Sequence, residues 1–350
     1  MSSTNRAVLK VLKGDPLFPP PIWMMRQAGR YLSEYREIRA QVPEFLNFCY
    51  DVDRATEVTL QPIRKFGFDA AILFSDIFVV PDAIGYPVRF EEGRGPVLEP
   101  LHEDLIEALD LDRAQEHLKP VFEILSRLRN ELPDKTTLLG FCGAPWTVAC
   151  YTVAGHTTPD QTAARIGAFE QPALMDALIE QLVVASISYL SRQLEAGADA
   201  LQIFDTWAGV LDETGFERWC LEPTRRIVEG VRKTHPDAII IGFPKGSAGR
   251  LERYVEVTGV NAVGLDWSAP FDIAKTLQRR GIPVQGNLDP MRLIAGGEAL
   301  DEGVDRILKE LGKGPLVFNL GHGITPQTPV KHVMQMVDRV RSAGDRIGNG

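Results

Sequence analysis

The chain has 350 residues, of which 47 are acidic and 38 are lysine or arginine, so its net charge is −9. This acidic balance disfavours a nucleic-acid-binding protein, which needs a broad basic surface. No apolar run approaches the roughly 20 residues that span a bilayer, and the N-terminus lacks the apolar core of a signal peptide. The cysteines Cys49, Cys142, Cys150 and Cys220 show no metal-binding or disulfide-dense spacing, so we expect a cytoplasmic protein with no membrane association.

Eight short apolar segments, taken in chain order, predict buried strands of a parallel sheet. They span residues 21–25, 66–76, 136–141, 196–205, 238–243, 258–267, 282–286 and 315–320. Three of them repeat one pattern: a glycine (Gly67, Gly197 or Gly259), one residue, Asp or Asn, Ala, and an apolar run. Each glycine is expected to end the preceding helix in the left-handed conformation.

Helical patterns separate most of these segments. Residues 173–195 repeat leucine at four-residue spacing, and apolar residues recur with helical spacing over 330–340. Eight strands alternating with helices predict a single-domain (β/α)8 TIM barrel over residues 1–350. A doubly wound parallel sheet is the alternative that strand counting leaves open. Residues 91–100 are expected to form a surface excursion.

In a barrel, functional side chains follow the C-terminal ends of the strands, which places an active-site cleft there. The residues at these positions are Arg26, Asp76, residues 143–147, Asp205, Thr206, Lys245, Asp266, Asn287, Asp289 and residues 321–323. For Asp266 and Asp289, capping of a turn is an equally good expectation.

Several familiar catalytic motifs are missing from the sequence. It contains no HExxH, no phosphate-binding GxxxxGK[ST], no GxSxG and no dinucleotide-binding GxGxxG. No lysine stands in a context typical of a Schiff-base former. We therefore expect acid–base or electrostatic chemistry with no metal and no cofactor.

The arginines near the N-terminus divide into two groups. Arg36 has Glu34 and Glu37 close by in a helical pattern, which is typical of a solvated helix face. Arg26 and Arg30 follow an apolar segment with no acidic residue nearby, and guanidinium groups bind carboxylates bidentately. These two arginines therefore predict an anionic ligand rather than a structural role.

Asp76 stands between apolar residues in AAILFSDIFVV (70–80). A carboxylate in such a place is costly to bury unless it meets donors or a positive charge. One interpretation is an ion pair with a core arginine. The other is a functional acceptor for ligand N–H groups, or a stabiliser of a cationic intermediate.

Five motifs, in order, resemble the uroporphyrinogen decarboxylase family: PIWMMRQAGRYLSEYREIR (21–39), AAILFSDI (70–77), GAPWT (143–147), GNLDP (286–290) and FNLGHGI (318–324). The resemblance covers about residues 5–345. It implies a homodimeric (β/α)8 barrel that needs no cofactor. Such enzymes convert the four acetate side chains of uroporphyrinogen III to methyl groups, giving coproporphyrinogen III and four CO2 in porphyrin biosynthesis.

The resemblance also implies roles for individual residues. Arg26 and Arg30 would bind substrate carboxylates, and backbone N–H groups of Gln27, Ala28 and Gly29 would join them. Asp76 would accept hydrogen bonds from the pyrrole N–H groups and stabilise the cationic intermediate. Further substrate-binding positions are Tyr151, Thr206, which replaces the serine of many members, and His322. Arg39 stays undecided, as does the proton donor, for which the high pKa of arginine is unfavourable.

Two other functions stay open. A corrinoid-linked zinc methyltransferase shares the barrel but uses histidine and cysteine ligands, and no HxC pair occurs in this sequence. A non-catalytic tetrapyrrole carrier would keep the binding site without the chemistry.

Overall fold

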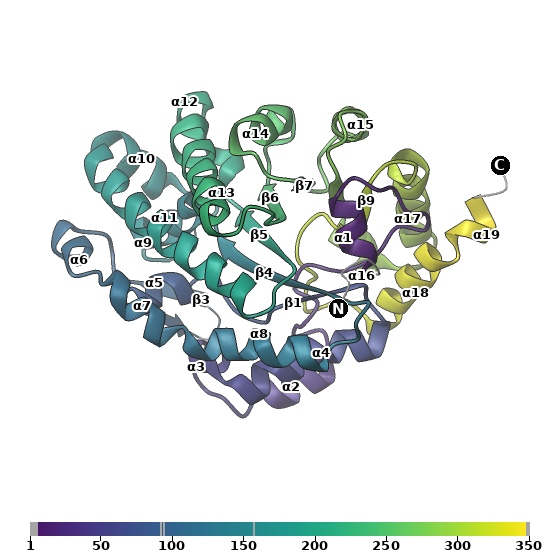
Figure 1. The fold of residues 1–350 in the computed structure, drawn as a ribbon, viewed down its shortest axis with the longest axis horizontal. Helices are drawn as coiled ribbons and strands as arrows, with labels where there is room; N and C mark the ends of the chain where they lie inside the picture. The colour runs from purple at the N-terminus through teal and green to yellow at the C-terminus, as the bar shows by residue number, and fades with distance from the viewer. Residues whose placement is uncertain (1–5, 92, 94, 157, 348–350) are drawn as a thin grey trace.

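The structure is a computed structural model, and it describes residues 6–91, 93, 95–156 and 158–347. Seven parallel strands form one curled sheet with helices outside it (Figure 1). In sheet order the strands are β1 (Ala70–Ile72), β4 (Thr137–Gly143), β5 (Ala200–Asp205), β6 (Ile240–Pro244), β7 (Ala262–Gly264), β8 (Val284–Leu288) and β9 (Leu316–Leu320). This order follows the chain, as expected of a barrel and not of a doubly wound sheet.

Residues 21–25, the first of the eight predicted strands in chain order, are not a regular strand in the structure. Ile22 makes a single parallel bridge to Phe318 of β9, and the Trp23 N–H donates to the Phe318 carbonyl over 3.3 Å. On its other side, the carbonyl of Ile22 accepts from the Asp69 N–H at 2.8 Å. The prediction of eight strands is therefore corrected to seven strands and one bridged segment, because the ladder beside residues 21–25 extends over one residue pair only.

The strands separate two apolar cores. Inside the curled sheet lie Trp23, Leu139, Ile241, Phe243 and Val317, among others, packed with Val8, Leu9, Val11 and Leu12 of helix α1 (Ala7–Leu12). The alternate strand residues, such as Leu138 and Phe318, pack outward against the helices. This alternation follows from the two-residue period of a strand.

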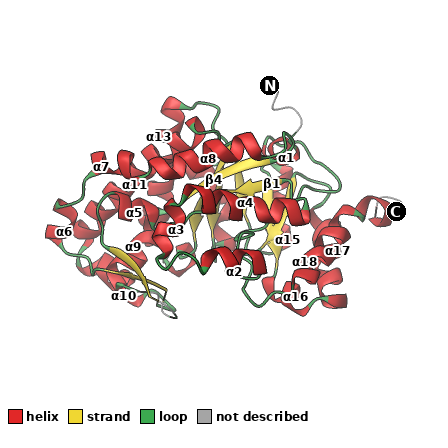
Figure 2. Cartoon of the chain, turned by 90° about the horizontal axis from the view of Figure 1, so that it is seen from below, coloured by secondary structure: helices red, strands yellow, loops and turns green. Residues whose placement is uncertain are grey.

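The helices account for most of the chain (Figure 2). Before β4 they are α2 (Ser33–Arg39), α3 (Phe45–Tyr50), α4 (Val52–Phe66), α5 (Val79–Ala83), α6 (Glu103–Glu107), α7 (Leu111–His117) and α8 (Lys119–Glu131). Between β4 and β6 they are α9 (Pro145–Ala154), α10 (Thr162–Glu170), α11 (Pro172–Glu195), 3-10 helix η2 (Ala208–Val210), α12 (Glu213–Gly215), π-helix η3 (Phe216–Leu221) and α13 (Glu222–Thr234). The remainder are 3-10 helix η4 (Ala248–Arg250), α14 (Leu251–Thr258), α15 (Phe271–Arg279), α16 (Pro290–Ala295), α17 (Gly297–Leu311), α18 (Val330–Arg341) and α19 (Ala343–Ile347).

The glycine pattern that preceded three of the predicted strands behaves as expected. Gly67, Gly197 and Gly259 have φ angles of 64°, 110° and 69°, and they follow α4, α11 and α14. The predicted excursion carries a two-stranded antiparallel hairpin, β2 (Val88–Glu91) and β3 (Gly95–Leu98).

We expected no segment to be apolar enough to cross a membrane, but one helix is. Among the described residues, α11 has the length and composition for it, with 24 residues. This helix packs on α13, α9 and strand β4, and half of its most apolar stretch is buried. It is therefore a core helix of the domain, in which apolar length serves packing.

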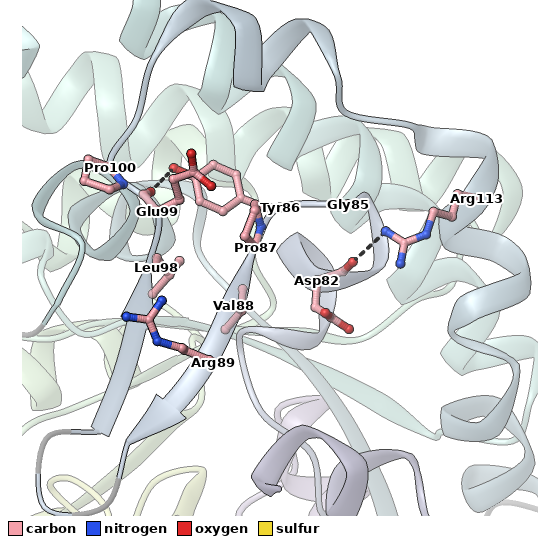
Figure 3. A pocket seen from close by; sticks show the side chains of 10 residues that line it. All are labelled: Asp82, Gly85, Tyr86, Pro87, Val88, Arg89, Leu98, Glu99, Pro100 and Arg113. Carbon is pink, nitrogen blue, oxygen red and sulfur yellow. Dashed lines mark hydrogen bonds between the residues drawn. The ribbon is translucent and has the colours of Figure 1, made fainter.

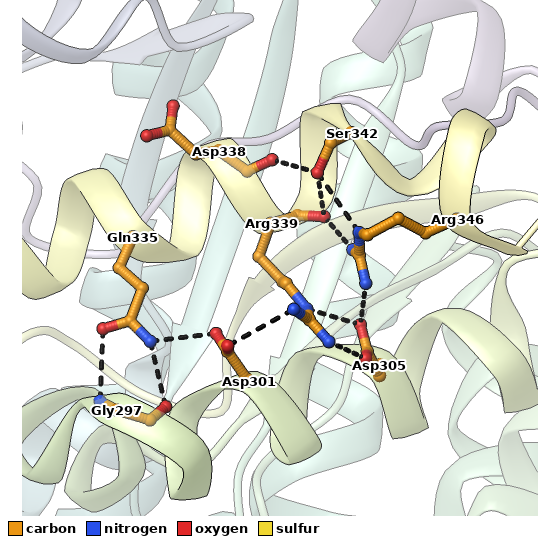
Figure 4. Close-up of polar contacts among 8 residues, drawn as sticks. All are labelled: Gly297, Asp301, Asp305, Gln335, Asp338, Arg339, Ser342 and Arg346. Atoms are coloured by element: carbon orange, nitrogen blue, oxygen red, sulfur yellow. Dashed lines mark hydrogen bonds and ion pairs between the residues drawn. The ribbon is translucent and has the colours of Figure 1, made fainter.

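Polar contacts hold the last helices together (Figure 4). Arg339 of α18 pairs with Asp301 and Asp305 of α17, and Arg346 of α19 reaches Asp305 at 2.8 Å. Gln335 adds a hydrogen bond to Asp301 at 2.9 Å. Because these groups are partly exposed, each ion pair is expected to add little to the stability of the protein.

Candidate active site

Seven residues follow the strands or residues 21–25 in the chain, and we call them the strand-end site: Arg26, Arg30, Asp76, Tyr151, Thr206, Lys245 and His322. The charge of Arg26 acts on the pKa of Asp76, of Tyr151 and of His322. The arginine that follows residues 21–25 is thus brought close to groups that follow β1, β4 and β9. Side chains more than 200 residues apart in the sequence form one site.

Arg26 and Arg30 are exposed, and neither side chain makes an ion pair within the described part of the chain. Arg26 adopts a left-handed backbone conformation with φ of 63°, which is uncommon for a residue with a side chain. Its side chain runs so close to Gly323 that a Cβ there would lie 2.4 Å from the Arg26 Cδ. A strained, unpaired arginine held against a glycine is suited to an anionic ligand.

Gln27 holds the loop, and its backbone N–H donates to the Met24 carbonyl at 3.1 Å. Its buried side chain accepts from the Met24 N–H and donates to the Ala70 carbonyl of β1, each at 3.1 Å. The predicted donor role of Gln27 stays a prediction, although its N–H has a partner within the loop. The backbone N–H groups of Ala28 and Gly29 have no partner among the described residues, so their predicted role stays a prediction.

The Asp76 carboxylate is half-buried after β1, and its Oδ1 accepts from the Phe78 N–H at 3.0 Å. Burial raises its pKa to about 6, although the Phe78 N–H and the positive charge of Arg26 act in the opposite direction. No arginine of the described residues forms an ion pair with Asp76, which disfavours the structural interpretation of this residue. Asp76 can lose its proton near neutral pH and then offers a charged acceptor.

Tyr151 and Thr206 come from the neighbouring strands. The Tyr151 ring packs edge-on to Phe78 at 5.0 Å. Burial raises the pKa of its phenol, an effect that a hydrogen bond with the Trp207 side chain and the charge of Arg26 offset in part. Thr206 directly follows β5 and is half-buried, and its hydroxyl makes no hydrogen bond within the described ranges. Both residues can therefore offer hydroxyl groups to a ligand.

His322 is kept neutral. Burial and the charges of Arg26 and Lys245 lower its pKa to about 3, and Asp266 counters this only partly. The imidazole lies 6.2 Å from the Phe243 ring and 6.4 Å from the Trp267 ring. At neutral pH it can donate or accept a hydrogen bond, but it cannot act as a fourth cation.

Three other strand-end residues turn out to be structural. Asp266 accepts from the Gly246 N–H at 2.6 Å and from Ser268, Asp289 caps α16, and Asn287 donates to two backbone carbonyls. Asp205 is buried, and burial raises its pKa to about 6 while the Thr147 hydroxyl donates to it at 2.5 Å. It supports the loop that carries Thr206.

The two helix arginines also have structural contacts. Arg39 donates to the carbonyls of Val42 and Pro43 and lies over the Phe45 and Phe48 rings. Its guanidinium is therefore occupied.

The sequence context of Arg36 suggests a pair with Glu34. In the structure Glu34 instead pairs with Lys65 of α4, at 2.7 Å. Arg36 instead donates to the Arg30 carbonyl at 2.7 Å. This contact positions the backbone of a predicted ligand-binding residue.

A cavity of about 560 Å³ lies apart from this site, beside the β2–β3 hairpin (Figure 3). Asp82, Tyr86, Arg89 and Arg113 are among its lining residues, and none of the predicted site residues lines it. Arg113 is committed to the carbonyl of Asp82 at 3.2 Å.

The contact between Gly323 and Arg26 gives a prediction. In Gly323→Ala the new methyl group should displace the Arg26 side chain, because the two would otherwise overlap. We expect KM to rise several-fold, roughly the effect of displacing one charged contact with the substrate. The melting temperature should stay close to that of the unchanged protein. Steady-state kinetics and thermal unfolding measure both; an unchanged KM would contradict the role of Arg26.

Comparisons with known proteins agree with this geometry. The family model "Uroporphyrinogen decarboxylase (URO-D)" matches residues 3–343. Proteins named uroporphyrinogen decarboxylase from Brucella anthropi and Mesorhizobium japonicum are each 59% identical, covering 96% and 97% of this chain and 98% of their own length. The corresponding Brucella canis protein is 60% identical over 96% of this chain and 98% of its own length.

Solved structures show the same fold at low identity. A methyltransferase from Methanosarcina mazei matches with a TM-score of 0.79 at 20% identity, over 96% of this chain and 97% of its own. A B12-independent methionine synthase from Shewanella matches with a TM-score of 0.54 at 12% identity, over 85% and 87% of the two chains. The fold is thus shared with methyl-transferring proteins, but the family match and the high sequence identities show that this chain belongs to the uroporphyrinogen decarboxylase family.

Proposed function

We propose that the strand-end site removes the carboxyl groups from the four acetate side chains of uroporphyrinogen III, giving coproporphyrinogen III and CO2. The observation that carries this proposal is that the Asp76 carboxyl, whose pKa burial raises to about 6, lies within electrostatic reach of Arg26, a cation with no ion-pair partner among the described residues. The cation can hold a carboxylate of the substrate. The carboxylate of Asp76 can hold the positive charge that the reaction creates.

The chemistry explains why a carboxylate is useful. Loss of CO2 from an acetate arm would leave an unstabilised carbanion. A proton added to the pyrrole α-carbon makes the ring cationic, so that the electron pair of the breaking C–C bond flows into the ring as CO2 leaves. The exocyclic methylene then takes up a proton and becomes a methyl group, while the ring carbon loses the proton it gained.

Within this scheme each residue has a distinct task. Ionised Asp76 accepts the pyrrole N–H groups and stabilises the cationic ring, through a preorganised charge that costs little reorganisation. Arg26 and Arg30 bind peripheral carboxylates, with the N–H groups of Ala28 and Gly29. Neutral His322 and the hydroxyl groups of Tyr151 and Thr206 complete the polar contacts.

We also propose a domain organisation, an oligomeric state and a cellular location. The described residues form one barrel domain, in which residues 21–25 take the place of an eighth strand; their contacts to both β9 and Asp69 support this. The protein acts as a homodimer in the cytoplasm, without nucleic acid or membrane as a partner.

Anaerobic incubation with uroporphyrinogen III, followed by chromatography of the oxidised products, tests the proposed reaction. We expect hepta-, hexa-, penta- and tetracarboxylate products in succession. A substrate that is bound but stays octacarboxylate would favour the non-catalytic carrier.

Removal of metal ions is expected to leave the activity unchanged. Within the described residues no group of three or more His, Cys, Asp or Glu side chains is arranged to hold a metal. Dialysis against a chelator, followed by the same product assay, measures this. Activity that is lost on dialysis and restored by zinc would favour the zinc methyltransferase alternative.

A further inference from the structure

Lys245, which follows β6, is a cation of the strand-end site without an assigned role. Its Nζ lies 5.9 Å from the ring centre of Trp207 and 5.2 Å from that of Trp267. No carboxylate of the described residues lies within 4.0 Å of it. The side chain is half-buried, so its positive charge is partly removed from water without an ionic partner.

Asp266, the nearby acidic residue, is not free to pair with Lys245. Asp266 accepts from the Gly246 N–H through Oδ2 and from the Ser268 N–H, at 2.8 Å, through Oδ1. Its Oδ2 is thus held by the loop after β6, and its Oδ1 by the turn after β7. The two indoles attract the ammonium group through their π-faces, but they cannot neutralise its charge.

Backbone contacts position the two loops that carry the indoles. The backbone N–H of Trp207 donates to the Thr147 hydroxyl at 3.1 Å, and that hydroxyl donates to buried Asp205. A Cβ on Gly321 would lie 2.3 Å from the Trp267 nitrogen, so the β9 loop closely packs the loop that carries Trp267. The loops that carry the two tryptophans are therefore held in place, and their indoles form a slot beside the ammonium group.

Lys245 also lies within electrostatic reach of the proposed substrate contacts. Its charge lowers the pKa of His322, as does the charge of Arg26, so both cations lie within electrostatic reach of the imidazole. Arg26 follows residues 21–25, whereas Lys245 follows β6. A macrocycle with carboxylates around its edge can contact both cations at once.

We propose that Lys245 is a further substrate-binding residue, which holds a peripheral carboxylate of the tetrapyrrole in the slot between Trp207 and Trp267. This inference rests on the proposed function. The bound carboxylate is one that does not react in that turnover, because Asp76 is placed to serve the reacting ring. Lys245 therefore contributes to substrate affinity and orientation and not to the chemical step.

The test compares Lys245→Met, which keeps the length and apolar stem, with Lys245→Arg, which keeps the charge. Lys119→Met is the matched control, because Lys119 is 61% exposed on α8 and pairs with Glu116. Anaerobic product formation from uroporphyrinogen III gives KM and kcat for each variant. The measurement is repeated from about 50 to about 500 mM salt, since an ionic contact weakens as the Debye length shortens.

For Lys245→Met we expect a KM about 10-fold higher, as for the loss of one charge-assisted contact, with kcat changed by less than about twofold. The ratio of its KM to that of the unchanged protein should fall towards one at high salt. Lys245→Arg should recover most of the affinity, and Lys119→Met should behave like the unchanged protein.

Other results would overturn the inference. If the unchanged protein turns over and Lys245→Met keeps its KM, or loses kcat alone, Lys245 does not bind the substrate. A KM increase that is independent of salt and not recovered by arginine would show a merely structural role. An unchanged protein that forms no product overturns the proposed function and this inference with it.

Discussion

Asp76→Asn should reduce kcat by about 10²–10³-fold, the usual cost of removing one preorganised charge-stabilising group. Asparagine has the same shape, and its oxygen can still accept from the Phe78 N–H, as Asp76 does at 3.0 Å. It cannot carry the negative charge that stabilises a cationic ring. Steady-state kinetics under anaerobic conditions measure the effect, and KM should change much less than kcat.

The same variant should be more stable than the unchanged protein at alkaline pH. Burial raises the Asp76 pKa from 3.8 to about 6, so the folded state favours the protonated form. The stability that this form contributes is complete below pH about 4 and is lost as the pH rises through about 6. The cost of ionisation, on the order of 3 kcal/mol at pH 8, is absent in asparagine.

Thermal unfolding at pH 4 and pH 8 separates the two effects. Asp76→Asn should unfold at the higher temperature at pH 8, and the difference should shrink towards pH 4. If the variant is less stable at both values, the carboxylate has a structural role that the contacts of Asp76 do not show.

Replacement of both Arg26 and Arg30 by alanine should raise KM by about 10²–10³-fold, from two charge-assisted contacts of about 1.5–3 kcal/mol each that partly overlap. The effect should shrink as salt is added, because both side chains are exposed and their charges are screened. The kcat at saturation should fall less. KM and kcat over a series of salt concentrations measure this.

A control variant distinguishes local binding from general charge. Arg64→Ala removes a positive charge from the outer face of α4, where Arg64 pairs with Glu57. We expect it to leave KM within about twofold, as surface ion pairs contribute little. If Arg64→Ala and the double variant raise KM equally, the arginines act through the overall charge of the protein and not through contact.

Much of the fold follows from sequence patterns that have a direct physical cause. A nearly continuous apolar run is what a strand buried on both faces requires, and glycines with positive φ marked three of the helix ends. The segment at residues 21–25 reads as a strand because Trp23 faces the interior and Ile22 the helices. How many of its residues would pair with a neighbour depends on the distance between β9 and β1, which no local pattern encodes.

The sequence predicts those site residues whose type and neighbours are unusual. An arginine without an acidic neighbour in the sequence and a carboxylate among apolar residues are unusual enough to stand out, and the charge of Arg26 does act on the pKa of Asp76. The partners of the other polar residues depend on contacts between distant segments. Gln27 binds β1, Arg36 binds the carbonyl of Arg30, and the slot around Lys245 joins the loops after β5 and β7.

In the proposed mechanism, an ionised Asp76 carries the reaction. The pH dependence of kcat/KM for anaerobic product formation, measured from about pH 5 to 8, tests it most directly, because this ratio reports groups of the free enzyme. We predict that kcat/KM rises with pH through an apparent pKa near 6, as the Asp76 carboxyl loses its proton. Asp76→Asn should lose this rise along with most of its rate. A rise that persists unchanged in Asp76→Asn, or a variant as fast as the unchanged protein, would contradict the account.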